Sequence, residues 1–191
     1  MEKKYSYLFK DALIFDGGQT QPYLSDLAIK NDLICAIGKL STDDAEQVYE
    51  LDSKALSPGF IDVHTHDDNA VLKNPECLPK ISQGVTTVIV GNCGLSVAPV
   101  RLNNDPPDPL NLLGSQKDFS FPTFKSYVDE VNNVHPAVTV AALVGHTSLR
   151  VNHMQDLYLE ASVAELEGMQ KELDQCLQEG AIGLGTGLAY G

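Results

Sequence analysis

Two histidines separated by one residue are the first feature of this sequence that could do chemistry. If the segment around His64 and His66 is a strand, side chains two residues apart point to the same face, so both imidazoles would face the same way. Neutral imidazole is a good ligand for zinc and similar ions. Without other evidence, a pair of this kind is equally compatible with a metal site and with two partly exposed loop histidines. The Pro-Gly dipeptide before the pair and the acidic pair Asp67 and Asp68 after it favour a metal site, with Asp68 lining it.

Three further side chains stand at the ends of predicted strands. Cys93 lies among glycine and asparagine after the β-branched run 85–90, which favours a thiolate ligand over the more common buried cysteine. His146 follows the next strand, where it would be a ligand or a hydrogen-bonding neighbour of the ligands. Tyr190 follows the last strand, and its hydroxyl could bind a substrate carboxylate or carbonyl, or the ring could simply pack. The remaining cysteines have no such context and are predicted to pack: Cys35, Cys77 and Cys176.

The elements that would position these residues fall into two groups. Residues 1–57 are predicted to form a small all-β unit of short strands, with a tight hairpin at Asn31 and Asp32, because both residue types tolerate positive φ. Residues 58–191 alternate between strand and helix patterns, which is typical of a parallel sheet covered by helices. The predicted strands are 60–64, 85–90, 137–144 and 181–184, and the predicted helices are 76–83, 122–133 and one capped by Ser162 with Glu165.

The number of these units predicts the fold class. The chain has 191 residues, whereas a closed (β/α)8 barrel takes about 250. We therefore expect an α/β protein in which about the first four βα units of a partial (β/α)8 TIM barrel follow the small β unit. The final strand runs directly to a terminal glycine, which predicts a fragment of a longer protein. Residues 95–120 are predicted to be a long loop, and loops of that length are usually functional or flexible.

Composition excludes several classes of partner. Lys and Arg number 13 and Asp and Glu number 26, and the formal net charge of −13 argues against nucleic acid and anionic membranes. No apolar stretch is long enough to span a bilayer, and charged residues interrupt any signal peptide. The four cysteines form no Cys-x-x-Cys pair. A reduced, cytoplasmic protein acting on a small molecule is the resulting expectation.

Four segments together resemble the N-acyl-D-amino-acid deacylases (D-aminoacylases) of the amidohydrolase superfamily. The resemblance covers essentially the whole chain, and the combination is specific although the histidine pair alone is not. Thr147 departs from the pattern, because the family usually has glycine after the preceding histidine. The four segments are residues 57–66, 84–94, 145–150 and 180–190.

This resemblance implies a set of roles. Cys93 would be a metal ligand where other amidohydrolases use a carboxylated lysine, and His64 and His66 would belong to a weaker or second metal position. Tyr190 would bind the substrate carboxylate. The cofactor would be one or two zinc ions, and the reaction would hydrolyse an N-acyl-D-amino acid to a carboxylate and a free D-amino acid. The remaining histidine ligands and the catalytic aspartate belong to strands 5, 6 and 8, so this chain is expected to hold no catalytic base.

The implied mechanism is metal-assisted amide hydrolysis, in which zinc lowers the pKa of its water to about 7 and an aspartate moves the proton to the leaving amine. Residues 1–191 alone are expected to be inactive. Two alternatives stay open. A cyclic-amide hydrolase of the hydantoinase or dihydroorotase kind would want a lysine at the end of the fourth strand, and residues 181–191 contain none. A non-catalytic scaffold on the same fold would be expected to have lost metal ligands, whereas His64 and His66 are both present.

Overall fold

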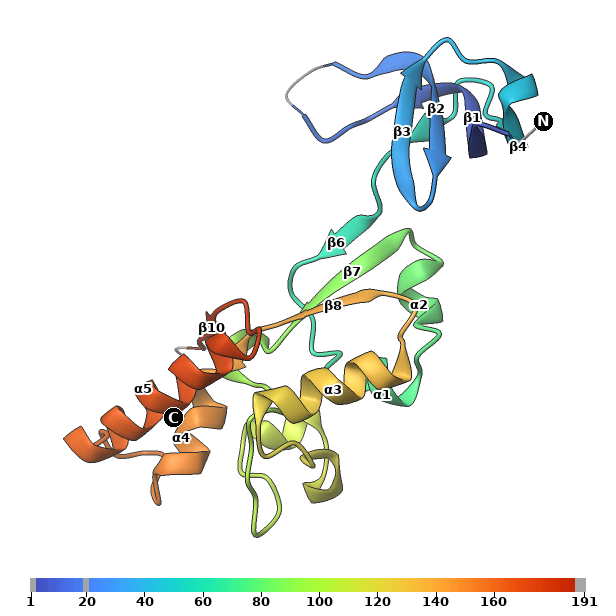
Figure 1. Cartoon of the computed structure of the whole chain (residues 1–191). Coiled ribbons are helices and arrows are strands. Elements are labelled where there is room, and N and C mark those ends of the chain that lie inside the picture. The colour runs from blue at the N-terminus through green and yellow to red at the C-terminus, as the bar shows by residue number, and fades with distance from the viewer. Residues whose placement is uncertain (1–2, 19–20, 188–191) are drawn as a thin grey trace. The chain divides into compact units, whose positions relative to one another are not determined.

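A computed structural model describes residues 3–18 and 21–187. The chain divides into two compact units, Met1–Pro58 and Gly59–Gly191. Figure 1 traces the elements of each unit in chain order. The α/β class that the sequence predicts is confirmed, with sheets that mix parallel and antiparallel pairing.

The first unit is a five-stranded sheet. Its strands are β1 (Tyr5–Ile14), β2 (Tyr23–Lys30), β3 (Leu33–Gly38), β4 (Ala45–Glu50) and β5 (Ala55–Leu56), and one 3-10 turn spans Thr42–Asp44. The order is β3-β2-β1-β4, with β5 also paired to β1. The β1–β2 and β2–β3 pairs are antiparallel, whereas β4 and β5 run parallel to β1. The predicted hairpin is confirmed: Asn31 and Asp32 have φ of 52° and 62° between β2 and β3.

A buried carboxylate organises the interior of this sheet. Asp26 on β2 accepts hydrogen bonds from Lys10 Nζ at 2.8 Å and from the backbone N–H groups of Asp11 at 3.0 Å and Leu40 at 2.8 Å. Burial alone would raise the pKa of Asp26, but these three donors lower it below its usual range. The register of β1 against β2 shifts between Phe9 and Ala12, next to this carboxylate. Asp26 therefore stabilises an irregular strand far in sequence from the candidate site.

The second unit contains a three-stranded parallel sheet, in the order β6-β7-β8, and a two-stranded parallel pair of β9 and β10. The strands are β6 (Phe60–Asp62), β7 (Val85–Val90), β8 (Thr139–Ala142), β9 (Val144–Gly145) and β10 (Leu184–Gly185). The helices are α1 (Ala70–Lys73), α2 (Leu78–Ile81), α3 (Phe124–Val134), α4 (His146–His153) and α5 (Val163–Gln178), with 3-10 turns at Asn92–Gly94, Leu110–Leu113 and Gln116–Asp118. In Figure 1, β6, β7 and β8 lie side by side, with α1, α2 and α3 along them.

One helix cap was predicted from the sequence and one helix was not. The cap of α5 is confirmed: Ser162 Oγ accepts from the N–H of Glu165 at 3.3 Å, and Glu165 Oε2 accepts from the N–H of Ser162 at 2.8 Å. Helix α4 was not predicted. It begins at His146, directly after β9, because Gly145 is still extended and the helix follows with no intervening turn. Residues 146–153 carry little helical periodicity, so only tertiary packing reveals this helix.

The first strand of the second unit is shorter than the predicted 60–64, and its apolar side chains are exposed. β6 ends at Asp62, and Phe60 and Ile61 are 61% and 60% exposed. β6 pairs only with β7 among the described residues, so it is an edge strand. The apolar run predicts a strand correctly, but burial of that strand depends on a second strand or a helix packed against it, besides β7.

The long segment after β7 is packed. Residues 95–100 are buried against β7 and α3, and Val100 N–H donates to Phe121 O at 3.0 Å. Arg101 Nη1 lies 2.5 Å from Glu172 Oε1 on α5. Glu172 Oε2 also accepts from Asn152 Nδ2 at 3.0 Å and lies 2.9 Å from His153 Nε2. This network fixes the segment to α4 and α5, so its first part is a structural element.

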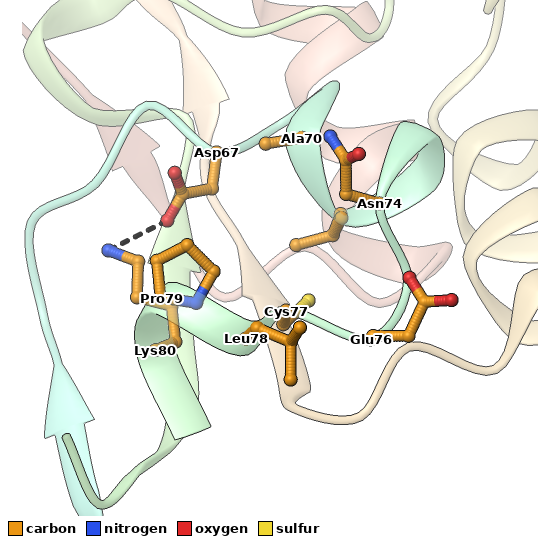
Figure 2. Close-up of a pocket in the computed structure, with 9 residues that line it drawn as sticks. Asp67, Ala70, Asn74, Glu76, Cys77, Leu78, Pro79 and Lys80 are labelled. Atoms are coloured by element: carbon orange, nitrogen blue, oxygen red, sulfur yellow. Dashed lines mark ion pairs between the residues drawn. The ribbon is translucent and has the colours of Figure 1, made fainter. Parts of the chain in front are cut away.

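The segment between β6 and β7 encloses a pocket of about 520 Å³ (Figure 2). Lys80 on α2 reaches across its wall to the Asp67 carboxylate, with Nζ 2.9 Å from Oδ2. Cys77 is buried in this pocket, as the sequence predicts. Cys176 is buried on α5, which also agrees with the prediction. Cys35 is exposed, which contradicts the prediction that it packs. Asp67 directly follows the second histidine, so this pocket lies beside the candidate site.

Candidate metal centre

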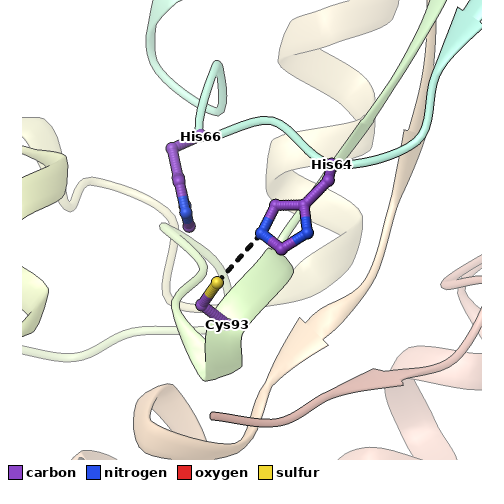
Figure 3. Close-up of side chains that lie close together, drawn as sticks. All are labelled: His64, His66 and Cys93. Atoms are coloured by element: carbon purple, nitrogen blue, oxygen red, sulfur yellow. Dashed lines mark hydrogen bonds between the residues drawn. The ribbon is translucent and has the colours of Figure 1, made fainter. Parts of the chain in front are cut away.

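Three possible ligands come together in the second unit. His64 Nε2 lies 3.0 Å from Cys93 Sγ, and the ligand atoms of His64, His66 and Cys93 all lie within 4.8 Å of one another. The two imidazole rings are 5.9 Å apart and inclined at 74°. Figure 3 shows the histidines on the segment that follows β6 and Cys93 on the turn that follows β7.

The backbone of the cysteine turn sets the direction of the thiol. Cys93 has φ of 56° and ψ of 21°, the left-handed region that L-residues other than glycine, asparagine and aspartate seldom occupy. Gly91 and Gly94 on either side both have φ of 79°. A Cβ on Gly91 would lie 2.1 Å from Leu143 O, so no side chain fits there. The small residues around Cys93 thus permit a tight turn.

Two further glycines let neighbouring strands support this turn. A Cβ on Gly185 of β10 would lie 2.2 Å from Gly91 O, and one on Gly145 of β9 would lie 2.5 Å from Gly94 O. The backbones of β9 and β10 therefore contact the cysteine turn directly. At Gly185 the two backbones approach more closely than any side chain would allow.

A lysine that the sequence did not single out holds the histidine segment. Lys80 Nζ lies 2.8 Å from Asp62 Oδ2 and 2.9 Å from Asp67 Oδ2. Asp62 Oδ1 accepts from the backbone N–H of His64 at 3.3 Å. The hydrogen bond from Lys80 lowers the pKa of Asp62, so this carboxylate stays charged. The contacts join residues 13 and 18 positions apart in sequence, so no local pattern indicates them.

Burial lowers the pKa of the second histidine, His66. The pKa of His66 lies below its usual value of 6.5, mainly because burial disfavours the charged ring and then because His64 is close. A lowered pKa keeps the imidazole neutral at neutral pH, and only the neutral ring offers a lone pair to a metal.

Asp68 is buried next to the cysteine turn. Its residue is 1% exposed, and Oδ1 accepts from the N–H of Val97 at 3.4 Å. Burial raises the pKa of Asp68 to about 7. Tyr127 on α3 donates its hydroxyl to the Asp68 carbonyl at 2.9 Å. Asp68 thus contacts the segment that leaves the turn carrying Cys93.

The other predicted site residues have different positions. His146 is the first residue of α4 and is partly buried, and burial followed by the charge of Arg150 lowers its pKa. It does not belong to the ligand cluster found in the described part of the chain. Tyr190 lies outside the described residues.

Comparisons with known proteins assign the chain to a family. Residues 47–189 match the amidohydrolase family, and the chain belongs to that family. The resemblance to the N-acyl-D-amino-acid deacylases is confirmed. An N-acyl-D-aspartate deacylase of Alcaligenes xylosoxydans xylosoxydans is 43% identical over 184 residues, which are 96% of this chain and 37% of that protein.

Two solved structures are also similar. The crystal structure of a D-aminoacylase that defines a novel subset of amidohydrolases matches with a TM-score of 0.93 and 43% identity. An N-acyl-D-glutamate deacylase from Bordetella bronchiseptica, in complex with zinc and a phosphonate inhibitor, matches with a TM-score of 0.90 and 38% identity. Each match covers 98% of this chain and 39% of the solved chain, so the chain spans about two fifths of the length of these relatives. In the described ranges, no helix has the length and apolar character needed to cross a bilayer.

Proposed function

We propose that this chain supplies metal ligands to a zinc-dependent N-acyl-D-amino-acid deacylase, which releases a carboxylate and a free D-amino acid. The observation that carries the proposal is the convergence of His64, His66 and Cys93 within 4.8 Å. The family membership and the deacylase relatives support the same chemistry. The presence of all three candidate ligands of this chain argues against the non-catalytic scaffold.

The residues fit a zinc ion. Two imidazoles and a thiolate are ligands that zinc prefers. Two atoms bound to one tetrahedral zinc ion lie roughly 3.5 Å apart, which falls between the 3.0 Å of the His64–Cys93 contact and the 4.8 Å limit of the cluster. A solved deacylase relative is a zinc complex. One or two zinc ions are therefore the proposed cofactor.

Each site residue of this chain has a defined task in the proposed reaction. When bound, the metal polarises the scissile carbonyl and activates water. His64 and His66 hold it as neutral rings and Cys93 holds it as a thiolate. Lys80, through Asp62 and Asp67, keeps the histidine segment in place. His146, the first residue of α4, is proposed to hydrogen-bond a ligand or the substrate.

Substrate recognition and proton transfer need further groups. Tyr190 is proposed to bind the substrate carboxylate, so that the acyl carbonyl faces the metal position. The catalytic base is proposed to be an aspartate outside residues 1–191, since the relatives extend well beyond the matched span. We therefore expect residues 1–191 alone to show no deacylation.

The architecture proposed for the second unit follows from the same site. The parallel order β6-β7-β8 and the parallel pair of β9 and β10 support the proposal that the second unit forms the first four βα units of a (β/α)8 barrel. His64, His66 and Cys93 follow the carboxyl ends of β6 and β7, where parallel barrels place their sites. Residues 58–191 would form this half-barrel and residues 1–57 a separate β unit.

The test is zinc content and activity of the complete protein. We expect Cys93→Ala to lose zinc and to hydrolyse N-acetyl-D-aspartate, N-acetyl-D-glutamate and N-acetyl-D-methionine at least 100-fold more slowly. Cys35→Ala, which removes an exposed thiol of the first unit, is the matched control and should keep both properties. Full zinc content in the Cys93→Ala protein would contradict the ligand assignment. Equal rates on the L-enantiomers would contradict the substrate class.

A further inference from the structure

We propose that Asp68 is a positioning residue for Cys93: its buried side chain accepts the backbone N–H of Val97, four residues after Cys93, and so holds the thiol against the two histidines. The inference rests on the proposed function, because it assumes that Cys93 binds metal. It assigns to Asp68 a task that its place in the sequence, two residues after His66, does not by itself indicate.

The first step is that Asp68 is fixed on the histidine segment. Its residue is 1% exposed, and Tyr127 on α3 donates its hydroxyl to the Asp68 carbonyl at 2.9 Å. The segment from His66 to Asp68 is therefore held to α3 by a hydrogen bond to its main-chain carbonyl as well as by packing. A carboxylate in such a place is costly unless hydrogen bonds compensate its lost hydration.

The second step is that the side chain of Asp68 is bound to the segment that leaves the cysteine turn. Oδ1 accepts from Val97 N–H at 3.4 Å, and Val97 follows Cys93 by four residues. The contact therefore joins the histidine segment to the chain just after the thiol. The second oxygen, Oδ2, is buried and has no hydrogen-bond partner among the described residues.

The third step is that the turn needs such support. A residue in the left-handed region costs about 1 to 3 kcal/mol and persists only where the surrounding structure holds it, and Cys93 has φ of 56°. Asn92 Nδ2 donates to Ile89 O at 2.8 Å and approaches Thr65 O at 3.4 Å, so a second contact joins the turn to the backbone between the histidines. Asp68 contributes the more deeply buried contact of the two, because its residue is 1% exposed.

The experiment measures how Cys93 binds a probe metal. The complete protein is freed of metal and titrated with Cd²⁺, and the thiolate-to-metal charge-transfer absorption reports the sulfur bond directly. Asp68→Asn keeps the shape of the side chain but replaces one acceptor oxygen with a donor. We expect Cd²⁺ affinity about 10- to 100-fold weaker, as is typical when a group that orients a ligand is changed, together with a weaker absorption band.

The matched control is Asp26→Asn. Asp26 is also a buried carboxylate that accepts backbone N–H groups, but it lies in the first unit. If Asp26 has only a structural role, Asp26→Asn should lower the unfolding midpoint of the protein and leave the Cd²⁺ affinity and the absorption band unchanged. The contrast between the two variants separates positioning of Cys93 from general stability.

Three outcomes would overturn the inference. In the first, Asp68→Asn folds and keeps wild-type affinity and absorption. If Asp68→Asn does not fold, Tyr127→Phe is the deciding variant, because it loosens only the main chain at Asp68. It should weaken Cd²⁺ binding several-fold. Unchanged Cd²⁺ affinity in Tyr127→Phe is the second outcome that would overturn the inference. The third is a wild-type protein that binds Cd²⁺ with no thiolate band, which would refute the metal role of Cys93 in the proposed function and the inference with it.

Discussion

Replacing Gly91 by alanine should separate the cost of a strained backbone from the cost of a steric collision at the cysteine turn. Gly91 has φ of 79°, and a Cβ there would lie 2.1 Å from Leu143 O. The Leu143 N–H donates to Val90 O at 3.0 Å, so the carbonyl belongs to a paired piece of backbone that cannot rotate away alone. The turn or the β8–β9 junction must therefore shift by roughly 1 Å to restore ordinary contact.

Two terms set the expected magnitude. Placing alanine in the left-handed region costs about 1 to 2 kcal/mol, and forcing an extra methyl into packed structure costs typically 1 to 3 kcal/mol. Gly91→Ala should thus lower the free energy of unfolding by about 2 to 5 kcal/mol. Gly17 is the matched control, because it has φ of 78° and no atom within 4 Å of the position of its Cβ. Gly17→Ala should lose only the first term.

The assay is equilibrium denaturation of both variants of the complete protein, with zinc content measured on the folded material. The Gly91→Ala protein should be the less stable of the two and should hold less zinc, because the displaced turn moves Cys93 away from His64. Equal stability of the two variants would refute the steric reasoning. Full zinc content in a destabilised Gly91→Ala protein would show that the turn does not set the position of the thiol.

Three further results are expected. Lys80→Met should weaken zinc binding several-fold while Lys80→Arg restores most of it, because a cation between Asp62 and Asp67 holds the histidine segment; equal zinc affinity in the methionine variant would exclude the clamp. Glu172→Gln should cost about 1 to 3 kcal/mol of unfolding free energy at pH 7, because Glu172 accepts from Arg101 and two other side chains. Burial opposes ionisation of Glu172, yet these donors lower its pKa below the usual 4.5. Its contribution is therefore present above pH 4.5 and lost as pH falls through the lowered pKa, so the difference between wild type and variant in urea titrations should shrink towards acid. Residues 1–191 expressed alone should release no D-amino acid in a coupled oxidase assay.

Local chemistry in the sequence determined much of the structure. Strand β7 has the predicted bounds of the β-branched run 85–90, and Ser162 with Glu165 caps α5 as predicted. The Asn31–Asp32 hairpin also depends only on its own residue types. In these places neighbouring residues carry the whole signal. The types and spacing of His64, His66 and Cys93 likewise predicted one metal cluster, because residues that follow adjacent parallel strands emerge at the same edge of a sheet.

Only the tertiary structure decided how that cluster is held. Lys80 pairs with Asp62 and Asp67 across chain separations of 18 and 13 residues, and Asp68 contacts Val97, in the segment that leaves the cysteine turn, across 29 residues. No sequence periodicity records such contacts, because they depend on where separate loops meet. The exposure of β6 and the helix that begins at His146 also followed from neighbours in space. The sequence thus determined which side chains can bind a metal, and the packing of distant backbone decided whether they point at one another.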